Sequence, residues 1–444
     1  MSDERMVAAS SGSDAPSTRA ALPVAFVVQV VTDLELVAPI AAAVRASGGA
    51  VVAWVRGKAL KKTPELRVAL DAALPGWREL DDEELPSELA AGSGAATRPA
   101  VLLAPTESNA PAHRFARRLV EQAHRGGVRT ATLQHGFDNV GLTWFDGDYP
   151  PGSVDFAAQR IFTWGPDERL HPAIDAATRA KCVAIGCSKP ARTAAPLPSR
   201  PAPGAPLIAV FENLHWSRYS EGYRAAFLRD LEAAAAASPH ACFFVRPHPA
   251  GKWLTERFEG ARPKAANLLL AAPDDARFAA WTTPVLLALA DGVITTPSTI
   301  ALDGARAGRP VAVAAYDLAL PDYAPLPLLR GVADWTRFIA AVTPAAAPPA
   351  AALPVASPAA APRALLVAQS AAFVARACLE GDGAQRIAAQ LLAPPPDWPA
   401  PSLDTATIAA TSRSAASSAN AAFRTAPLAP PAPRSWWRRL FGRR

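Results

Sequence analysis

Residues 22–31, Leu-Pro-Val-Ala-Phe-Val-Val-Gln-Val-Val, form a continuous apolar run near the start of the chain. Such a run is typical of a strand that is buried on both faces, as in a parallel sheet. A helical pattern follows over residues 34–46 and ends at Gly48-Gly49, and residues 50–55, Ala-Val-Val-Ala-Trp-Val, predict a second strand. This strand–helix–strand alternation predicts a doubly wound α/β sheet.

The same alternation occurs on both sides of a proline-rich break, and a length of 444 residues favours two or three domains. The fold class predicted is therefore α/β, with two Rossmann-like doubly wound domains. The predicted division is a disordered leader at 1–20, a first domain at 21–190, a linker at 191–206, a second domain at 207–393 with a low-complexity insert at 343–363, and a disordered tail at 394–444.

Composition and charge narrow the class of protein. The net charge is +6, but five arginines lie within the last eleven residues, so the excess belongs largely to the tail and predicts no nucleic-acid partner. The four cysteines include no CxxC pair and predict free thiols in a reducing cytosol. The chain has no apolar stretch of 18 residues and no signal-peptide pattern at its start. We therefore expect a cytoplasmic protein, soluble or peripheral to a membrane.

The first of three short motifs is Gln134-His-Gly136, which follows a predicted strand at 129–133. Ligands of open α/β sheets bind outside the carboxyl ends of the strands. Glycine lets the backbone approach a ligand closely, and a histidine with a pKa near ~6.5 can act as a general base. His135 is therefore the predicted catalytic base, with Gln134 and Gly136 beside it in the cleft. A histidine bonded only to loop backbone is the alternative.

The second motif, Arg246-Pro-His-Pro249, follows a predicted strand at 241–245, and Lys252 lies three residues beyond it. Two prolines stiffen the loop and direct the histidine. Arginine offers a bidentate fork and lysine a point charge, so Arg246, His248 and Lys252 together could hold a pyrophosphate. A rigid surface turn with incidental charges is the alternative.

The third motif, Thr295-Thr-Pro-Ser-Thr299, lies between a predicted strand and a predicted helix at 300–307. Small hydroxyl residues cap helices, and the backbone N–H groups at a helix start also bind phosphate. Simple capping would explain one hydroxyl, but it explains four of them less well. Thr296, Ser298 and Thr299 are therefore predicted to bind phosphate.

In this order the three motifs resemble those of the CDP-glycerol glycerophosphotransferase and capsule-polysaccharide synthesis families, over roughly residues 20–320. The matching segments are His135-Gly136, Arg246-Pro-His-Pro249 and Asp291-Gly-Val-Ile-Thr-Thr-Pro-Ser-Thr299. The resemblance implies a GT-B fold, in which the two domains face a cleft, and a transferase that extends a bacterial surface polysaccharide. It also implies that His135 is the base toward the acceptor hydroxyl, and that His248 and the Ser/Thr segment bind the phosphates of a nucleotide-activated donor.

The third motif also departs from those families, because the teichoic-acid type usually carries Asp-Tyr-Ser-Ser where this chain has Thr296-Pro-Ser-Thr299. The departure favours a nucleotide sugar over CDP-glycerol, so the expected activity is that of a glycosyltransferase or a glycerophosphotransferase-like enzyme. The donor is then a substrate, and no separate cofactor is expected. No D-x-D with the flanking strands typical of metal-dependent glycosyltransferases is present, so no metal is predicted.

Two other functions remain open. Gly381-Asp-Gly-Ala-Gln-Arg-Ile387 resembles the closing helix of the non-hydrolysing UDP-N-acetylglucosamine 2-epimerases, another GT-B family, although their Ser-Gly-Gly-x-x-Glu-Glu segment is absent. An epimerase requires carboxylates in the cleft, for which Glu212 and Asp303 are the candidates. Asn213, next to Glu212, is a further cleft candidate. A non-catalytic polysaccharide assembly or export factor is the other alternative.

The end of the chain combines aromatic and basic residues. The membrane-facing candidates are Trp436, Trp437, Arg438, Arg439, Leu440 and Phe441. Such a segment can lie at an anionic membrane surface, where each cation contributes about 1 kcal/mol. The sequence therefore predicts peripheral attachment to the inner face of the plasma membrane, which would suit a lipid-linked acceptor. A disordered, solubilising tail is the alternative.

Overall fold

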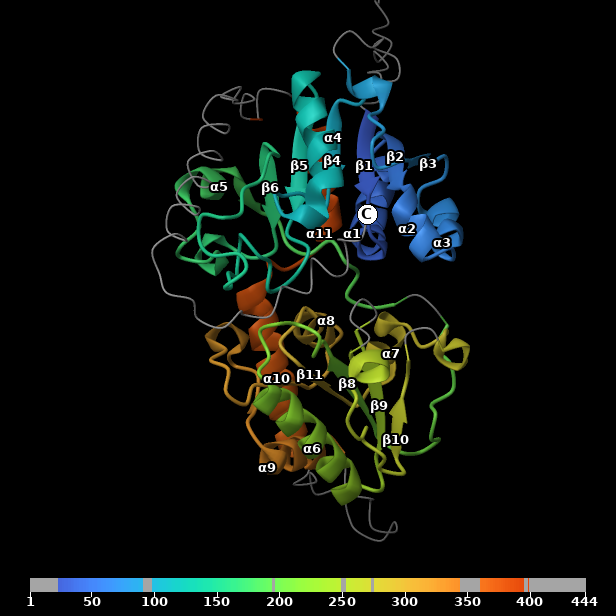
Figure 1. Ribbon diagram of the computed structural model, residues 1–444, viewed down its shortest axis with the longest axis vertical. Helices are drawn as coiled ribbons and strands as arrows, with labels where there is room; N and C mark the ends of the chain where they lie inside the picture. Colours follow the sequence, from blue (N-terminus) through green and yellow to red (C-terminus); the bar gives the residue numbers. More distant parts are fainter. Residues whose placement is uncertain are drawn as a thin grey trace, which may run out of the picture.

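The computed structural model contains two α/β domains (Figure 1). It describes residues 23–90, 98–193, 196–248, 253–272, 275–343, 360–394 and 398. The predicted leader, Lys252, most of the predicted insert and nearly all of the predicted tail lie outside the described residues. Among the helices that are described, none combines the length and the apolar character needed to cross a membrane.

The first domain is built on a parallel sheet with the strand order β3-β2-β1-β4-β5-β6-β7. Its strands are β1 (Pro23–Val28), β2 (Ala50–Arg56), β3 (Arg78–Leu80), β4 (Val101–Ala104), β5 (Arg129–Leu133), β6 (Arg160–Thr163) and β7 (Cys182–Ala184). Its helices are α1 (Val31–Ala46), α2 (Gly57–Lys62), α3 (Leu66–Ala73), α4 (Arg114–Arg125) and α5 (Ala176–Lys181).

The second domain repeats this plan with the strand order β10-β9-β8-β11-β12-β13, again all parallel. Its strands are β8 (Leu207–Glu212), β9 (Cys242–Pro247), β10 (Leu268–Leu270), β11 (Gly292–Thr295), β12 (Val311–Ala314) and β13 (Leu328–Leu329). Its helices are α6 (Glu221–Ala237), α7 (Thr283–Leu289), α8 (Ile300–Arg306), α9 (Val332–Val342) and α10 (Ala360–Ala377), and the chain ends in α11 (Gly383–Leu392).

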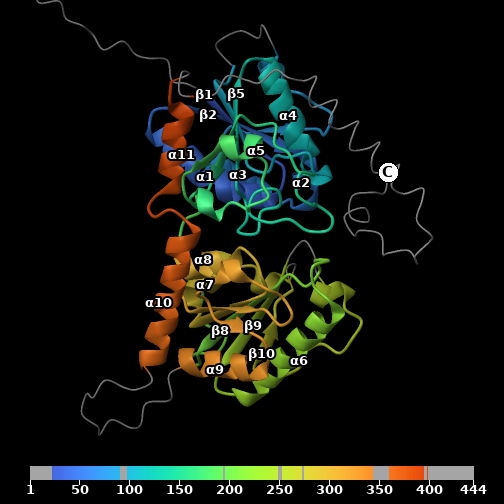
Figure 2. The same cartoon turned by 90° about the vertical axis from the view of Figure 1, so that its left-hand side faces the viewer.

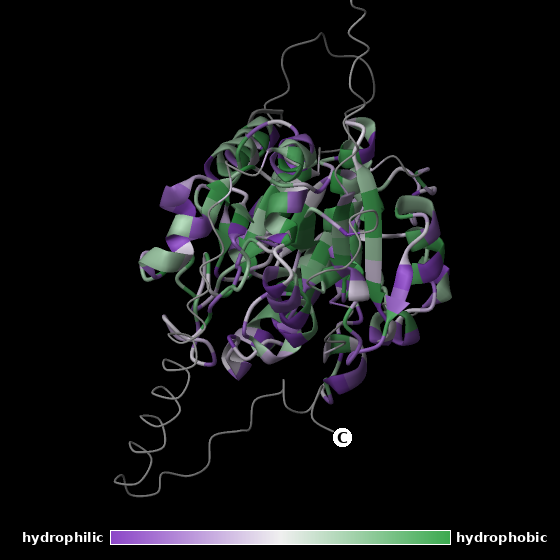
Figure 3. Ribbon diagram, turned by 90° about the horizontal axis from the view of Figure 1, so that it is seen from above, coloured by the Kyte–Doolittle hydropathy of each residue, from purple (hydrophilic) through white to green (hydrophobic). Residues whose placement is uncertain are grey.

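The central strands are apolar because helices cover both faces of each sheet. Every residue of β4, β8, β11 and β12 is buried, and the apolar strands lie inside a shell of more hydrophilic helices (Figure 3). Helix α1 begins at Val31, three residues earlier than predicted. The cause is Asp33, whose carboxylate accepts the backbone N–H groups of Gln29 at 2.9 Å and Val30 at 3.1 Å and so turns the chain directly after β1.

The end of the described chain ties the two domains together. Helix α10 packs against α8 and α9 of the second domain, whereas α11 packs against α1 of the first (Figure 2). A turn at Gly381, with a φ of 87°, separates the two helices. The last part of the predicted second domain, 207–393, therefore lies against the first domain.

Candidate functional site

The strand order of each sheet reverses beside its first strand, between β1 and β4 and between β8 and β11. Such switch points are where open α/β sheets bind ligands. The carboxyl ends of the two sheets face one another here, as contacts between their loops show. Phe137, after β5, donates its backbone N–H to Thr299 Oγ1 at 2.9 Å, and Asp138 forms an ion pair with Arg218 at 2.6 Å. Tyr323 donates its hydroxyl to the same Asp138 carboxylate at 3.0 Å.

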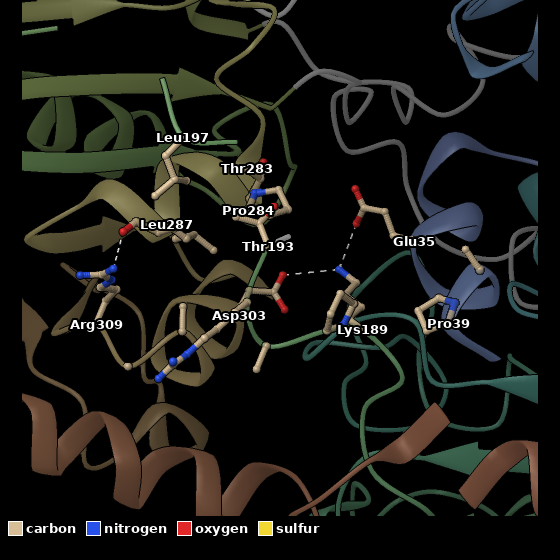
Figure 4. A pocket seen from close by; sticks show the side chains of 17 residues that line it. Glu35, Pro39, Lys189, Thr193, Leu197, Thr283, Pro284, Leu287, Asp303 and Arg309 are labelled. Atoms are coloured by element: carbon tan, nitrogen blue, oxygen red, sulfur yellow. Dashed lines mark hydrogen bonds and ion pairs between the residues drawn. The ribbon is translucent and has the colours of Figure 1, made fainter. Parts of the chain in front are cut away.

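A cavity of about 690 Å³ lies between the domains (Figure 4). Its walls come from α1, the interdomain linker, α7 and α8. The residues that give it chemical character are Glu35, Pro39, Lys189, Thr193, Pro284, Leu287, Asp303 and Arg309. The volume falls within the ~300–1,000 Å³ of small-molecule sites, which often form at domain interfaces. Both domains and the linker are therefore needed to form the cavity.

Lys189 connects the walls of the cavity. Its ammonium lies 3.4 Å from the Asp303 carboxylate on α8 and 3.5 Å from the Glu35 carboxylate on α1 (Figure 4). Burial by itself would lower the pKa of Lys189, but the carboxylates of Asp303 and Glu35 outweigh burial and raise it. Lys189 is therefore a fixed positive charge that holds one carboxylate from each domain.

His135 lies at the end of β5, as predicted, and its backbone N–H donates to Asn139 Oδ1 at 2.9 Å. Burial lowers the pKa of its side chain to about 4, the Leu133 backbone partly opposes this shift, and the charge of Lys189 adds to it. The imidazole is therefore neutral at pH 7 and able to accept a proton.

Gln134 and Gly136 shape the loop that carries His135. Gln134 is buried, donates to the Gly136 carbonyl at 2.9 Å and accepts the backbone N–H of Trp164 at 2.8 Å. A Cβ atom at Gly136 would lie 3.3 Å from Thr299 Oγ1. The glycine therefore allows close approach to the other domain, whereas the sequence predicted close approach to a ligand.

The second predicted motif lies at the end of β9. Arg246 donates to the Trp281 carbonyl at 2.6 Å, and burial lowers the pKa of its guanidinium. His248 is exposed, with its ring 4.8 Å from that of His215. Desolvation by the surrounding protein lowers the pKa of its ring, and the charge of Lys62 in the first domain adds to this shift. Neither His248 nor Arg246 lines the cavity.

The third motif is mostly engaged within the protein. Thr296 is completely buried and donates its hydroxyl to Asn213 Oδ1, while Asn213 donates its own side-chain N–H to the Pro297 carbonyl at 3.1 Å. Thr296 and Asn213 therefore join the loop after β11 to the loop after β8, and these hydrogen-bonding groups are not available to a ligand in this arrangement. Thr299 accepts the interdomain N–H of Phe137, and Ser298 Oγ lies 3.0 Å from Thr295 Oγ1. Ser298 and Thr299 are both only half-buried, but the hydroxyl of Thr299 is already engaged by Phe137.

Of the two carboxylates singled out from the sequence, only Asp303 lines the cavity. Glu212 is buried below the end of β8, where it accepts the Leu214 N–H at 2.7 Å. Burial raises its pKa to about 7, and the backbone N–H groups of Leu214 and Leu254 only partly oppose the rise.

Glu35 and Lys189 were not predicted as site residues. Lys189 immediately precedes the proline-rich linker, and a cation at the edge of an interdomain linker is a signal that could have been followed. Its two partners lie more than a hundred residues away along the chain, so the pairing itself depends on how the domains pack. All four cysteines are free. Within the described residues, no group of three or more His, Cys, Asp or Glu side chains is placed to hold a metal ion.

Comparison with known proteins identifies the fold. No family model matches the chain, and no curated protein matches its sequence. A Listeria monocytogenes protein assigned as a UDP-N-acetylglucosamine 2-epimerase is similar with a TM-score of 0.54 and 14% identity, covering 84% of this chain and 96% of that one. An S. aureus MnaA–UDP co-structure has a TM-score of 0.51 and 12% identity, and the match covers 82% of this chain and 95% of that one. The glycosyltransferase of kitacinnamycin has a TM-score of 0.49 and 13% identity, and the match covers 84% of this chain and 99% of that one.

At these identities the similarity concerns the fold. The chain has two Rossmann-like parallel α/β domains arranged as in GT-B proteins, among them UDP-N-acetylglucosamine 2-epimerases. The predicted GT-B fold class is confirmed.

Proposed function

We propose that this protein is a GT-B transferase that binds a nucleotide-activated sugar in the interdomain cavity and transfers the sugar to a hydroxyl group held near His135. The observation that carries the proposal is the position of Lys189, which lines the cavity and whose charge is close enough to His135 to lower the pKa of that histidine. The charge at the proposed donor site therefore acts on a neutral base.

The walls of the cavity suit a nucleotide. Asp303 at the switch-point helix can accept hydrogen bonds from ribose hydroxyls, as acidic residues do in other dinucleotide-binding sheets. Pro39, Pro284 and Leu287 provide apolar surface for a base. Lys189 provides a point charge for phosphate. Donor-phosphate binding by Ser298 and His248 stays part of the proposal on the sequence motifs alone, because neither side chain, nor that of Arg246, lines the cavity.

The proposed reaction needs one base and one leaving group. The acceptor oxygen forms a bond to the anomeric carbon of the sugar while its proton passes to the free ring nitrogen of neutral His135. The bond from that carbon to the donor phosphate oxygen breaks, and its electron pair leaves with the nucleoside diphosphate. The positive charge of Lys189 stabilises the negative charge that develops on the leaving phosphate.

The resemblance in sequence supports the finer part of the proposal. It points to a growing surface polysaccharide, of capsule, lipopolysaccharide or teichoic-acid type, as the acceptor, with a polyol-phosphate group as the other group that could be transferred. Association of residues 436–441 with an anionic membrane would bring the enzyme to a lipid-linked acceptor, although these residues lie outside the described part of the chain.

A second candidate is epimerisation of a nucleotide sugar. It is favoured by the carboxylates of Asp303 and Glu35, which line the cavity, because an epimerase needs groups that remove and return a proton. Both carboxylates form ion pairs with Lys189.

The test begins with nucleotide binding. Thermal shifts are measured with CDP, CMP, UDP, UMP, GDP and dTDP on the wild type and on Asp303→Asn, His248→Ala and Asp322→Asn. A ligand at 100 times its Kd stabilises the folded state by about 2.7 kcal/mol. Asp322 pairs with Arg169 across the domains but lies outside the cavity, so Asp322→Asn is the matched control. We expect one nucleoside diphosphate to raise the Tm of the wild type and of the control, and to raise that of Asp303→Asn much less.

Product analysis then separates the candidates. The nucleotide sugar that carries the selected nucleotide is incubated with and without oligosaccharide acceptors. Acceptor-dependent release of the nucleoside diphosphate, lost in His135→Ala, supports the transferase. Inversion of UDP-N-acetylglucosamine at C2 without acceptor would instead establish the epimerase. Binding without any turnover would favour the non-catalytic assembly factor, and no binding to folded protein would overturn the donor site.

A further inference from the structure

His113 lies beside His135, and Ser108 lies on the other side of His113. Ser108 follows β4, and His113 ends the short 3-10 turn Pro111–His113 that leads into α4. The His113 ring meets the His135 ring edge to face, with centroids 5.7 Å apart and planes at 89°. On its other side, His113 Nδ1 lies 2.6 Å from Ser108 Oγ. The three side chains form a row that starts at a buried serine and ends at the proposed base.

Ser108 holds one side of the His113 ring. Ser108 is buried, and its Oγ accepts the backbone N–H of Ala110 at 3.2 Å. Ser108 Oγ and His113 Nδ1 share a hydrogen bond in which the tautomer of the ring decides the donor. Burial, and secondarily His135, lower the pKa of His113 to about 3, so the ring is neutral. Ser108 therefore fixes the position of the His113 ring through its Nδ1 atom.

The charged groups around His135 come from several elements. Lys189, on the linker, acts on it directly, while Glu35 of α1 and Asp303 of α8 act through their pairing with Lys189. Asp138, on the loop of His135 itself, is neutralised by Arg218. His113 is the uncharged neighbour, and it occupies space that water would otherwise fill.

We propose that His113, held by Ser108, is a positioning residue that keeps the His135 ring oriented and shielded from water so that it can take the proton of an acceptor hydroxyl. This inference rests on the proposed function for its purpose, but the physical effect exists whether or not transfer occurs. Without the His113 ring, water would reach His135 and favour its protonated form.

The effect can be measured by NMR titration of the protein labelled at histidine, with His135→Ala to assign the signal. We expect His135 in the wild type to titrate below about pH 5. In His113→Ala its midpoint should rise by about one unit, because the desolvation that lowers it is partly lost. His113→Phe retains a ring of similar shape and should change the midpoint by less than a third of that shift. Ser108→Ala should give an intermediate rise.

A matched control is His124→Ala. His124 lies in α4 of the same domain and bonds to Thr130, so its loss removes a half-buried histidine without touching His135. We expect no change in the midpoint of His135 in this variant. If His113→Ala fails to fold, Ser108→Ala and His113→Phe supply the comparison.

Release of UDP from UDP-N-acetylglucosamine, followed against pH, provides the rate. We expect His113→Ala to lower kcat about tenfold at pH 6, to move the acid limb upward and to leave the KM for the donor unchanged, with rescue by His113→Phe. A wild-type midpoint for His135 in both His113→Ala and Ser108→Ala would overturn the inference, whatever the activity. An unchanged rate in His135→Ala would instead overturn the proposed role of His135 and leave the midpoint result standing.

Discussion

Replacement of Lys189 by methionine tests whether the two domains are joined by charge at the cavity. Methionine retains the length and apolar character of the lysine stem but removes the ammonium that lies between Glu35 and Asp303. The side chains of Lys189 and Asp303 are each 16% exposed, whereas that of Glu35 is 52% exposed. The substitution therefore leaves one carboxylate, Asp303, largely buried without its partner.

The magnitude follows from that geometry. At 3.4 Å and an effective dielectric constant of about 20, the gross attraction between Lys189 and Asp303 is ~5 kcal/mol. More than half of this attraction is offset, because the pair is desolvated on folding and because water enters around Asp303 in the variant. We therefore expect the free energy of unfolding to fall by about 2 kcal/mol. The exposed contact with Glu35 adds at most about 0.5 kcal/mol. The corresponding fall in Tm is about 5 °C.

The assay is a double-mutant cycle on Tm with Lys189→Met, Asp303→Asn and the two together. The double variant should recover most of the loss, since neither charge remains uncompensated. Arg169→Met with Asp322→Asn is the control cycle, because this interdomain pair has one carboxylate that is 60% exposed and should contribute little. In the NMR titration, Lys189→Met should also raise the midpoint of His135, because the charge that lowered its pKa is gone. A Tm for Lys189→Met no lower than for Arg169→Met would refute the reasoning.

Two further predictions concern buried polar groups of the second domain. The folded-state pKa of Glu212 is raised from 4.5 to about 7, so its contribution to stability is present below pH 4.5 and is lost as pH rises to 7. The free energy of unfolding of Glu212→Gln should therefore rise by up to about 3 kcal/mol relative to that of the wild type as the pH increases from 4.5 to 8. Tm measured against pH would show this, and parallel curves for the two proteins would contradict it. Asn213→Ala should lower the free energy of unfolding by about 2–3 kcal/mol, measured through Tm, because the hydroxyls of Thr296 and Tyr219 lose a buried acceptor. The control is Asn109→Ala, which removes an exposed amide. A loss for Asn213→Ala no larger than for this control would be evidence against the buried hydrogen-bond network.

Much of the fold could be predicted because buried parallel strands carry their own signal. The apolar runs at 24–28, 207–211 and 292–295 could hardly be anything but central strands, and glycines mark the helix ends that follow several of them. The edge strand β3 was missed. Arg78-Glu-Leu80 has three residues, one of them buried, so no pattern distinguishes it from a loop. Its strand character depends on pairing with β2, which is a tertiary contact.

The positions of the site loops could be predicted from the sequence, but the orientation of their side chains could not. His135 and His248 lie at strand ends, as the motifs indicate, because strand ends are visible as the place where apolar runs stop. Whether a loop hydroxyl turns toward a ligand or inward is decided by competition for hydrogen bonds. Thr296 turns inward because Asn213 and Tyr219 supply a buried network there. Lys189 could not be paired in advance, since its carboxylates are 154 residues before and 114 residues after it in the chain.

The interdomain contacts divide into two groups, and the division has a consequence for catalysis. On one side of the strand ends, the loop of His135 is held by Thr299 and Arg218. On the other, Lys189 joins α1 to α8. The cavity is formed by both domains and the linker, whereas the base lies in the first domain, so each contact contributes to the distance between donor and base. Loss of the Thr299 and Arg218 contacts should therefore weaken transfer more than nucleotide binding, because it changes the distance to His135 and leaves the residues that line the cavity in place. Loss of Lys189 should weaken both, because Lys189 itself lines the cavity.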